Sequence, residues 1–483
     1  MVNKKKSMFG SGKALLLVSA VLLSGILGCQ SSKSNKNPGE SPKPNVVVLL
    51  VDDAGYADFG FAGSEDMETP NIDKLARDGV VFTDAHVSAT VCGPSRAGLI
   101  TGRYQQRFGF ECNPSNSFAG LDLQEETIGD AMKKAGYVTA AFGKWHLGHD
   151  PEYRPNARGF DYFWGFLSGG RHYFPNDQQD QPGHSHSIRE NDDFTEFEGY
   201  LTDRLGEKAV EFIDRNKEKP FFIYWAPNAV HTPMEATEED ISRYEGHPRQ
   251  ELAAMTWALD RAVGNIKDKL EKENLLDNTL IFFLSDNGGA HNNQSSNAPL
   301  KGFKGNKYEG GMRVPFFMHW PAIIDGGKTF DGLTSAFDIF ATSLDAAGVP
   351  EEALTNLDGV SLLPYLEEKK DEDPHEKLFW RKDQAAAARV GDYKLIRVER
   401  LGYRLYNLRE NLGETDNLTD QNEQTFKALK KQLSKWEKDK MEPLWTESQT
   451  WDTITWMIHQ DLFLNREVRV KNPRQLQEYR NQK

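Results

Sequence analysis

NVVVLLVDDAGYAD, residues 45–58, predicts a buried strand with a site at its end. Six of the first seven residues are apolar, and four of these are valine. An uninterrupted apolar, β-branched run is typical of a strand that is buried on both faces. Asp52 and Asp53 follow directly, so the sequence predicts two carboxylates at the carboxyl end of this strand.

NTLIFFLSDNGG, residues 278–289, repeats the pattern and carries Asp286 and Asn287 just past its apolar run. In an open parallel sheet, ligands bind beyond the carboxyl ends of the strands, so the two pairs are expected to meet in one crevice. Three carboxylates and one amide oxygen form a hard site that suits Ca²⁺ first and Mg²⁺ second, and disfavours zinc. Either pair alone could equally mark a turn after its strand.

The 483 residues suffice for about two or three domains. The composition, 38% hydrophobic and 27% charged, is ordinary for a folded soluble protein. The formal net charge of −14 offers no basic surface for nucleic acid, which is therefore not an expected partner. An anionic substrate would need a local cluster of cations.

The first 28 residues are predicted to be a signal segment. Lysines at positions 4–6 precede a short apolar run at residues 14–27, which is too short for a comfortable membrane-spanning helix. ILGCQ resembles the lipobox of bacterial lipoproteins and implies cleavage before Cys29, with a lipid anchor on its sulfur. A plain secretory signal is the alternative. Residues 29–44 are polar and predict a flexible tether, so the folded part is expected in the periplasm or at the cell surface.

TVCGPSRAGLITGRY, residues 90–104, contains one of three cysteines. If Cys29 carries lipid, only Cys92 and Cys112 remain, too few for a disulfide framework, although one bridge between them is left open. Pro94 suits the first position of a helix, which would put Cys92 just before the helix N-terminus. Free backbone N–H groups and the helix dipole favour an anion there, so we expect chemistry on an anionic group.

Three further stretches supply cations and proton carriers. YVTAAFGKWHLG places Lys144 and His146 two residues apart, on the same side of an extended chain. PFFIYWAPNAVHTP brings His231 just beyond another apolar run, and FKGNKYEGGMRVP carries Lys304 and Lys307 in a Gly-rich loop. Five other histidines are expected to be surface or hydrogen-bonded residues: His149, His247, His319, His375 and His459.

CGPSRAGLITGR resembles the Cys-x-Pro-Ser-Arg signature of formylglycine-dependent sulfatases of the alkaline-phosphatase superfamily. The stretches quoted above follow in the family's order, and LDGVSLLP and RVGDYKLI are also similar, so the resemblance covers nearly the whole exported chain. It implies that a maturation enzyme oxidises Cys92 to formylglycine (3-oxoalanine). It implies a metal site formed by modified Cys92, Asp52, Asp53, Asp286 and Asn287. It also implies a sulfate site formed by Arg96, Lys144, His146, His231 and Lys304, with Lys307 as a solvated neighbour.

The chemistry implied by this resemblance explains why a cysteine would be converted. Hydrated formylglycine attacks the sulfur in line with the departing sugar oxygen, with Asp286 as the nearby base. His231 or Lys304 protonates the leaving oxygen. Loss of the second hydroxyl proton, to His146, then expels sulfate and restores the aldehyde. Arg96, Lys144 and Lys304 offset the charge on the sulfate oxygens.

Alternating strands and helices predict an α/β fold over residues 45–370, with a large, mostly parallel sheet flanked by helices. Crossover helices are expected near residues 128–134, 200–215 and 251–272. Residues 371–483 resemble the smaller C-terminal α+β subdomain of sulfatases, with an antiparallel sheet and a helix at residues 425–440. The tail at 441–483 contains three tryptophans and is expected to pack along the main body, either at the rim of the cleft or as cover for the core.

The substrate is expected to be a sulfated polysaccharide fragment, either algal or glycosaminoglycan-like. Loops at strand ends often carry specificity, so Arg171 and His172 of the polar loop at 168–187, together with His291, are predicted to contact the sugar. A solvated, His-rich loop is the alternative for the first two. Two other functions stay open: a formylglycine phosphonate or phosphate ester hydrolase, and a surface glycan-binding lipoprotein in which Cys92 is never converted.

Overall fold

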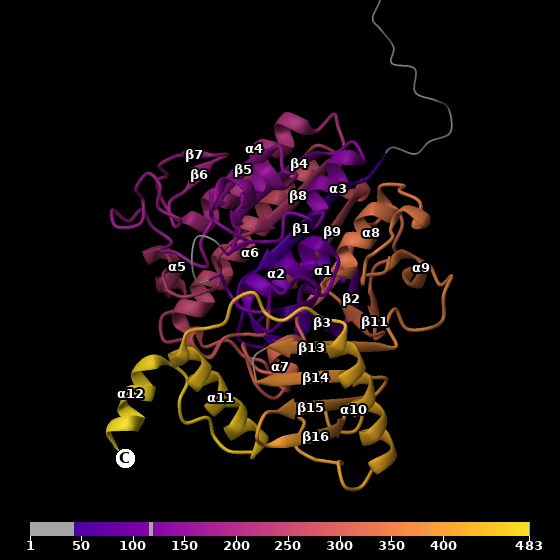
Figure 1. Ribbon diagram of the computed structural model, residues 1–483. Coiled ribbons are helices and arrows are strands. Elements are labelled where there is room, and N and C mark those ends of the chain that lie inside the picture. Colours follow the sequence, from indigo (N-terminus) through magenta and orange to yellow (C-terminus); the bar gives the residue numbers. More distant parts are fainter. Residues whose placement is uncertain (1–42, 115–118, 383, 483) are drawn as a thin grey trace, which may run out of the picture. The chain divides into compact units, whose positions relative to one another are not determined.

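The strand predicted at the start of the folded chain is β1 (Asn45–Val51), and all seven of its residues are buried. The structure is a computed structural model that describes residues 43–114, 119–382 and 384–482 (Figure 1). β1 pairs in parallel with β8 (Phe221–Ala226) on one side and β9 (Thr279–Ser285) on the other. Because these three strands run in the same direction, their carboxyl ends lie at one edge of the sheet. The predicted signal segment and residues 29–42 of the predicted tether lie outside the described residues.

Ten strands form the main sheet. Besides β1, β8 and β9 they are β2 (Val80–Phe82), β4 (Val138–Lys144), β5 (Tyr162–Phe166), β6 (Arg189–Glu190), β7 (Asp193–Phe194), β10 (Phe316–His319) and β11 (Lys328–Phe330). Their order is β11-β2-β10-β9-β1-β8-β4-β5-β6-β7. The central strands are parallel, whereas β10 is antiparallel to both of its neighbours, β9 and β2. β3 (Ala85–His86) and β12 (Thr334–Ser335) form a separate parallel pair.

Helices cover both faces of this sheet. Alternate residues of β1 point to opposite faces. Val47 joins a hydrophobic layer with α1 (Pro70–Arg77), α4 (Leu201–Asn216) and α6 (Gln250–Lys272). Val48 joins the opposite layer with α2 (Cys92–Thr101), α3 (Ile128–Lys134) and α8 (Asp338–Ala346). The shorter helices are α5 (Glu238–Arg243), α7 (Glu309–Met312) and α9 (Leu363–Leu366).

The three predicted crossover helices are observed as α3, α4 and α6, with bounds within one residue of those expected. α3 begins at a capping box: the Thr127 side chain accepts from the Asp130 N–H, and the Asp130 side chain accepts from the Thr127 N–H. This reciprocal pair satisfies two backbone donors that the helix leaves open at its start. Among the described residues, no helix is both long and apolar enough to cross a bilayer.

The C-terminal part contains a second, four-stranded antiparallel sheet. Its strands are β13 (Lys377–Lys382), β14 (Ala385–Val390), β15 (Tyr393–Val398) and β16 (Gly402–Asn407), paired in chain order. The predicted helix at 425–440 is α10 (Glu423–Lys438), which packs on β14 and β15. Two helices follow: α11 (Gln449–Phe463) and α12 (Pro473–Asn481). The predicted fold class is confirmed.

Candidate active site

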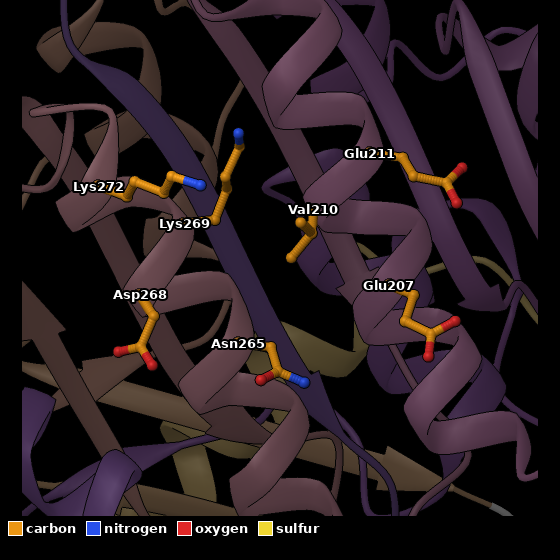
Figure 2. Close-up of a pocket in the computed structure, with 7 residues that line it drawn as sticks. All are labelled: Glu207, Val210, Glu211, Asn265, Asp268, Lys269 and Lys272. Atoms are coloured by element: carbon orange, nitrogen blue, oxygen red, sulfur yellow. The ribbon is translucent and has the colours of Figure 1, made fainter.

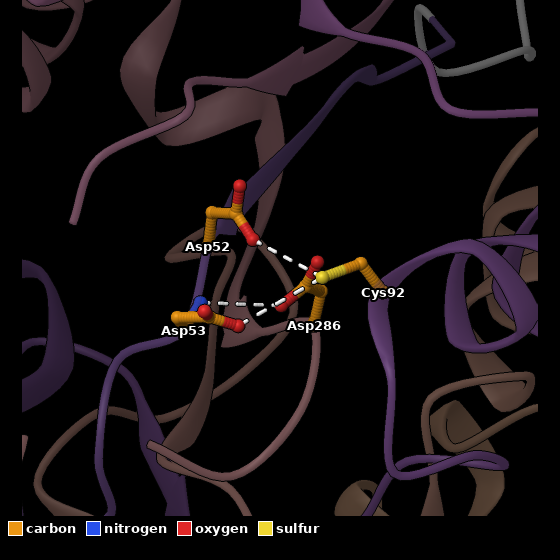
Figure 3. Close-up of side chains that lie close together, drawn as sticks. All are labelled: Asp52, Asp53, Cys92 and Asp286. Carbon is orange, nitrogen blue, oxygen red and sulfur yellow. Dashed lines mark hydrogen bonds between the residues drawn. The ribbon is translucent and has the colours of Figure 1, made fainter. Parts of the chain in front are cut away.

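The carboxylates that follow β1 and β9 meet beside the start of α2 (Figure 3). One ligand atom from each of Asp52, Asp53, Cys92 and Asp286 lies within 4.8 Å of the others, and all four residues are buried. Cys92 Sγ is 3.6 Å from Asp52 Oδ1 and 3.8 Å from Asp53 Oδ1. The Asp53 N–H donates to Asp286 Oδ1 at 3.3 Å. Parallel strand order therefore brings together groups that are far apart in the chain.

Cys92 is the first residue of α2, with Val91 at the N-cap. The prediction that Pro94 opens the helix is wrong by two residues, since Pro94 is its third residue. Burial, followed by the charge of Asp286, raises the pKa of the Cys92 thiol to about 12, although Lys144 and Lys304 oppose this. An unmodified thiol here is protonated at neutral pH and a poor nucleophile. Cys92 and Cys112 are not joined by a disulfide, so the bridge left open is not formed.

Each carboxylate has its own cation. Lys144 Nζ donates to Asp52 Oδ2 at 2.7 Å, and Lys304 Nζ donates to Asp53 Oδ2 at 2.8 Å and to Cys92 Sγ at 3.1 Å. Arg96 Nε donates to Asp286 Oδ2 at 2.9 Å, and its Nη1 donates to the Lys144 carbonyl at 2.8 Å. The name cysteine cluster is used below for these seven residues: Asp52, Asp53, Cys92, Arg96, Lys144, Asp286 and Lys304.

The cations divide the carboxylates into two kinds. Burial raises the pKa of Asp52, but Lys144, His231 and Arg96 outweigh it, so this pKa lies well below its ordinary value. Burial also raises the pKa of Asp53, but positive charges, chiefly that of Lys304, lower this pKa below its ordinary value. For Asp286, burial and the negative charge of Asp52 outweigh Arg96, and its pKa rises to about 6.

Asn287 supplies the feature that best indicates a metal. Its Nδ2 donates to Asp53 Oδ1 at 2.8 Å and to the Gly288 carbonyl at 3.0 Å. Its Oδ1 is buried and accepts no hydrogen bond from any described residue. Buried polar atoms nearly always have a partner. An unpartnered amide oxygen beside three carboxylates fits a hard divalent cation.

His146 and His231 lie beside the cluster, but not as an extended chain would place His146. His146 has φ of 61° and β4 ends at Lys144, so the prediction that the chain is extended through His146 is wrong. Burial and the charge of Lys144 hold its pKa well below the ordinary value. His231 Nδ1 lies 2.5 Å from the Thr232 carbonyl, so this nitrogen donates, and Nε2 lies 3.7 Å from Asp53 Oδ2. Burial lowers the pKa of His231 as well.

The loop after β5 packs tightly against these two rings. A Cβ on Gly169 would lie 2.7 Å from His146 Nε2, and one on Gly170 would lie 3.1 Å from His231 Cε1. Arg171 fixes this loop from inside. Its side chain is buried, and it donates to Asp180 Oδ1 and Oδ2 at 2.8 and 3.0 Å.

Arg171 is therefore not positioned to contact a sugar, which corrects that prediction. Its remaining donors bind the backbone carbonyls of His172 and His186. His172 is partly exposed and pairs with Glu235 at 2.5 Å, so its contact with a sugar stays a prediction. Lys307 is also corrected: it is buried rather than solvated, and its Nζ donates to Thr90 Oγ1 at 3.1 Å.

A cavity of about 510 Å³ opens beside the cysteine cluster. Asp53 and Lys304 line its inner end, together with His231 and His291. Another wall comes from the C-terminal part of the chain, in agreement with the alternative that places the tail at the rim of the cleft. The residues of this wall are Lys382, Glu447, Ser448, Trp451, Ile454, Thr455, Ile458 and Lys471.

A second hollow, of about 520 Å³, lies between α4 and α6 (Figure 2). Its lining is Val210 and polar or charged side chains that project from the two helices, as Figure 2 shows. Lys269 is already paired with Asp214 at 2.5 Å and with Glu273 at 2.6 Å. No cysteine or histidine lines this hollow, so it offers no nucleophile comparable to Cys92.

Comparisons with known proteins match nearly all of the described chain. The family "Sulfatase" matches residues 44–349, and "N-sulphoglucosamine sulphohydrolase, C-terminal" matches residues 303–439. Human N-acetylgalactosamine-6-sulfatase is 34% identical over 384 residues, covering 74% of this chain and 72% of that protein. The uncharacterized sulfatase YdeN of Escherichia coli (strain K12) is 34% identical over 394 residues, covering 70% of this chain and 68% of that protein. The crystal structure of Ps i-CgsB in complex with k-i-k-neocarrahexaose has a TM-score of 0.79 at 36% identity, covering 88% of this chain and 99% of that chain.

Proposed function

Because the chain belongs to the sulfatase family, and is a sulfuric ester hydrolase, we propose that its cysteine cluster hydrolyses sulfate esters of carbohydrates. One observation carries the proposal: Cys92 lies among three buried carboxylates and contacts Lys304, which also lines the cavity. Two similar proteins support the substrate class, since one is named for a sulfated amino sugar and the other was solved with a carrageenan oligosaccharide. Fragments of sulfated polysaccharides, algal or glycosaminoglycan-like, are the proposed substrates.

Conversion of Cys92 to formylglycine by a maturation enzyme is part of this proposal. A thiol with a pKa of about 12 is almost wholly protonated at neutral pH, so the unmodified side chain gives little nucleophile. The hydrated aldehyde would supply a hydroxyl nucleophile for attack on the sulfur. Lys304 Nζ, which contacts Cys92 Sγ, is placed to neutralise charge on a sulfate bound next to residue 92.

The proposed cofactor is Ca²⁺, with Mg²⁺ second. Asp52, Asp53, Asp286 and the unpartnered Oδ1 of Asn287 would hold it together with residue 92. A divalent cation at this position would stabilise negative charge on the sulfate oxygens. Removal of the cation with a chelator should lower kcat by about 100-fold or more, with recovery on adding Ca²⁺. Full activity after exhaustive chelation would refute the metal assignment.

The protein's own groups divide the remaining work. Arg96 fixes Asp286 through Nε and holds the Lys144 carbonyl through Nη1, so it orients the base and the cation at once. His231 Nδ1 is committed to the Thr232 carbonyl, so only Nε2 is available to give a proton to the leaving sugar oxygen. His146 is the proposed acceptor of the proton released with sulfate.

We also propose where the enzyme works. Residues 1–28 are a lipoprotein signal, Cys29 carries a lipid anchor, and residues 29–44 tether the enzyme in the periplasm or at the cell surface. Residues 45–370 form the catalytic part, and residues 371–483 form the C-terminal part. Mass spectrometry of the mature N-terminus tests the anchor: an unmodified Cys29, or a chain that begins elsewhere, would contradict it.

Sulfate release from a panel of defined sulfated oligosaccharides tests the main proposal. The Cys92→Ala variant should release none, whereas Cys112→Ala, a matched buried cysteine outside the cluster, should keep the activity. A higher kcat/KM for phosphate or phosphonate esters than for matched sulfate esters would favour the phosphoester alternative. A Cys92 thiol that is never converted, with no hydrolysis of any ester, would favour a glycan-binding protein instead.

A further inference from the structure

The segment after α10 is fixed to the catalytic part at its beginning. The Met441 N–H donates to the Gln106 carbonyl and the Leu444 N–H donates to the Gly109 carbonyl, both at 3.0 Å. Trp445 Nε1 donates to the Cys112 carbonyl at 3.0 Å, and its ring packs edge-on against Phe110. These contacts lead the chain from the end of α2 to the edge of the cavity. Both family matches end at or before residue 439, so this segment lies outside them.

α11 turns one face toward the cavity. Trp451, Ile454, Thr455 and Ile458 all line the cavity, and their spacing of three, four and seven residues places them on one side of a helix. Ile454 and Ile458 are buried, whereas Trp451 is 44% exposed. Trp451 is therefore the open, outer part of an otherwise closed apolar wall. α11 contacts β15, so it rests on the four-stranded sheet, as Figure 1 shows in yellow.

Lys471 belongs to the same wall and has no carboxylate partner among the described residues. Lys382 Nζ lies 3.0 Å from Glu447, and Lys304 forms an ion pair with Asp53. Lys471 forms no ion pair within the described residues. Burial, and then the positive charges of Lys471 and Lys304, lower the pKa of His291 to about 4. Both lysines therefore interact electrostatically with this ring. Three lysines thus line the cavity: Lys304 at the cysteine cluster, Lys382 paired with Glu447, and Lys471 without a carboxylate partner in the described part of the chain.

A chain with a net charge of −14 repels a polyanion, so a substrate with several anionic groups needs a local cation for each group that enters. Carbohydrate sites also need an apolar surface for the face of the sugar ring, with few polar groups to fix orientation. Trp451 and Lys471 supply both from the C-terminal wall of the same cavity that Asp53 and Lys304 line. A second anionic group on the substrate would give Lys471 a partner that the described residues do not supply.

We infer that Trp451 and Lys471 form a second subsite for the sugar that adjoins the one losing its sulfate. Trp451 stacks on the ring of that sugar, and Lys471 pairs with an anionic group on it, either a sulfate ester or a carboxylate. This inference rests on the proposed function and narrows its substrate to oligosaccharides with at least two anionic groups.

The first test compares kcat/KM on four sulfate esters: a small aryl sulfate and three oligosaccharides with the same reacting sugar and a sulfated, a carboxylated or a neutral neighbour. Trp451→Ala should lower kcat/KM about 10-fold on all three oligosaccharides, and far less on the aryl sulfate. Lys471→Ala should lower it about 10-fold only where the neighbour is charged. The charged neighbour that loses more identifies the preferred anionic group.

Two exposed residues of the same segment serve as matched controls. Gln449→Ala alters α11 outside the cavity, and Arg474→Ala removes an exposed cation of α12 that is paired with Glu478 at 3.0 Å. Neither should change kcat/KM on any of the four esters. Losses for Trp451→Ala and Lys471→Ala that are equal on the aryl sulfate and the oligosaccharides, or no larger than the controls, would overturn the inference.

A binding measurement separates this inference from the proposed function. In a Cys92→Ala background, which cannot hydrolyse the ester, calorimetry with the sulfated oligosaccharide gives Kd directly. Adding Trp451→Ala or Lys471→Ala should raise Kd about 10-fold. If no ester is hydrolysed by the matured enzyme, the proposed function fails, but a raised Kd still supports the subsite. An unchanged Kd overturns the subsite even where hydrolysis is observed.

Discussion

Two buried groups of charged side chains differ in what surrounds them rather than in charge. The cysteine cluster contains three carboxylates and three cations. A second group, named the interface cluster here, also contains three of each and lies where α7, the β3–β12 pair and the four-stranded sheet meet. Its members are Asp84, His86, Glu309, Arg313, Arg389, Lys394 and Glu414.

The interface cluster is closed. Lys394 Nζ lies 2.7 Å from Glu309 Oε1 and 2.8 Å from Glu414 Oε1, and all three residues are fully buried. His86 Nε2 lies 3.0 Å from Glu309 Oε2. Asp84, His86 and Glu309 are close enough to hold a metal, but arginines and Lys394 already neutralise the carboxylates. No member of this cluster lines the cavity beside Cys92.

The cysteine cluster is open. Asp53 and Lys304 line the cavity, and Asn287 Oδ1 is left without a hydrogen-bond donor among the described residues. The comparison teaches that equal numbers of buried charges do not mark a reactive site. Access to a cavity distinguishes the group that can react from the group that holds two sheets together.

The largest expected effect is on catalysis at the open cluster. Cys92→Ala should lower kcat by at least about 10⁴-fold, because the nucleophile is removed, while the melting temperature changes little. Cys112→Ala should leave kcat within a factor of about 3, since the group of close ligand atoms at the site contains Cys92 and not Cys112. Hydrolysis by Cys92→Ala at the wild-type rate would remove the functional contrast between the two clusters.

Breaking the closed cluster should affect stability instead. Lys394→Met leaves Glu309 and Glu414 without their shared cation, which should lower the free energy of unfolding by about 3–5 kcal/mol. The control is Lys427→Met, which breaks an exposed pair with Glu423 and should leave the free energy of unfolding nearly unchanged. Denaturant titration measures both, and kcat of folded Lys394→Met should equal that of the wild type. A loss of kcat without a loss of stability would contradict the distinction.

A smaller effect is expected where the loop after β5 supports the open cluster. A Cβ at Gly169 would press on the His146 ring at 2.7 Å, so Gly169→Ala should displace this ring and lower kcat about 10- to 100-fold. Gly413→Ala is the matched control, because its Cβ would meet nothing closer than 3.7 Å. Unchanged kcat in Gly169→Ala would show that His146 does not need its observed position.

The last expected effect is a pH dependence of stability at the closed cluster. Burial and the charge of Glu309 outweigh Lys394 and raise the pKa of Glu414 to about 7, from an ordinary value of 4.5. Between these values the folded state binds more protons than the unfolded state, so this group makes stability fall as pH rises from about 4.5 to 7. The unfolding free energy of the wild type, relative to Glu414→Gln, should therefore decline over that range and then level off. A difference that is constant with pH would contradict the raised pKa.

Much of the fold follows from local patterns in the sequence. The apolar runs of β1 and β9 predicted buried parallel strands, and parallel strands bring Asp52, Asp53 and Asp286 to one edge. Helical periodicity predicted α3, α4 and α6 to within one residue. These features depend on short stretches of chain and on a general rule of sheet topology.

The missed features depend on contacts between distant segments. His146 leaves the strand in a left-handed conformation that no neighbouring residue indicates. Arg171 is buried because Asp180 and two carbonyls occupy its donors, and a polar loop gives no sign of this. The interface cluster joins strands and loops that share no sequence pattern. For the tail, the sequence left two places open, the rim of the cleft and the cover of the core, and only the structure puts α11 at the cavity.

The central claim is that the open cluster releases sulfate through a converted Cys92. The most direct measurement determines, in the same preparations, the fraction of Cys92 converted to the aldehyde by peptide mass spectrometry and the rate of sulfate release. Preparations made with varying amounts of maturation enzyme should give rates that rise in proportion to this fraction and reach zero with it. Sulfate release at the full rate from protein whose Cys92 is entirely thiol would contradict the account.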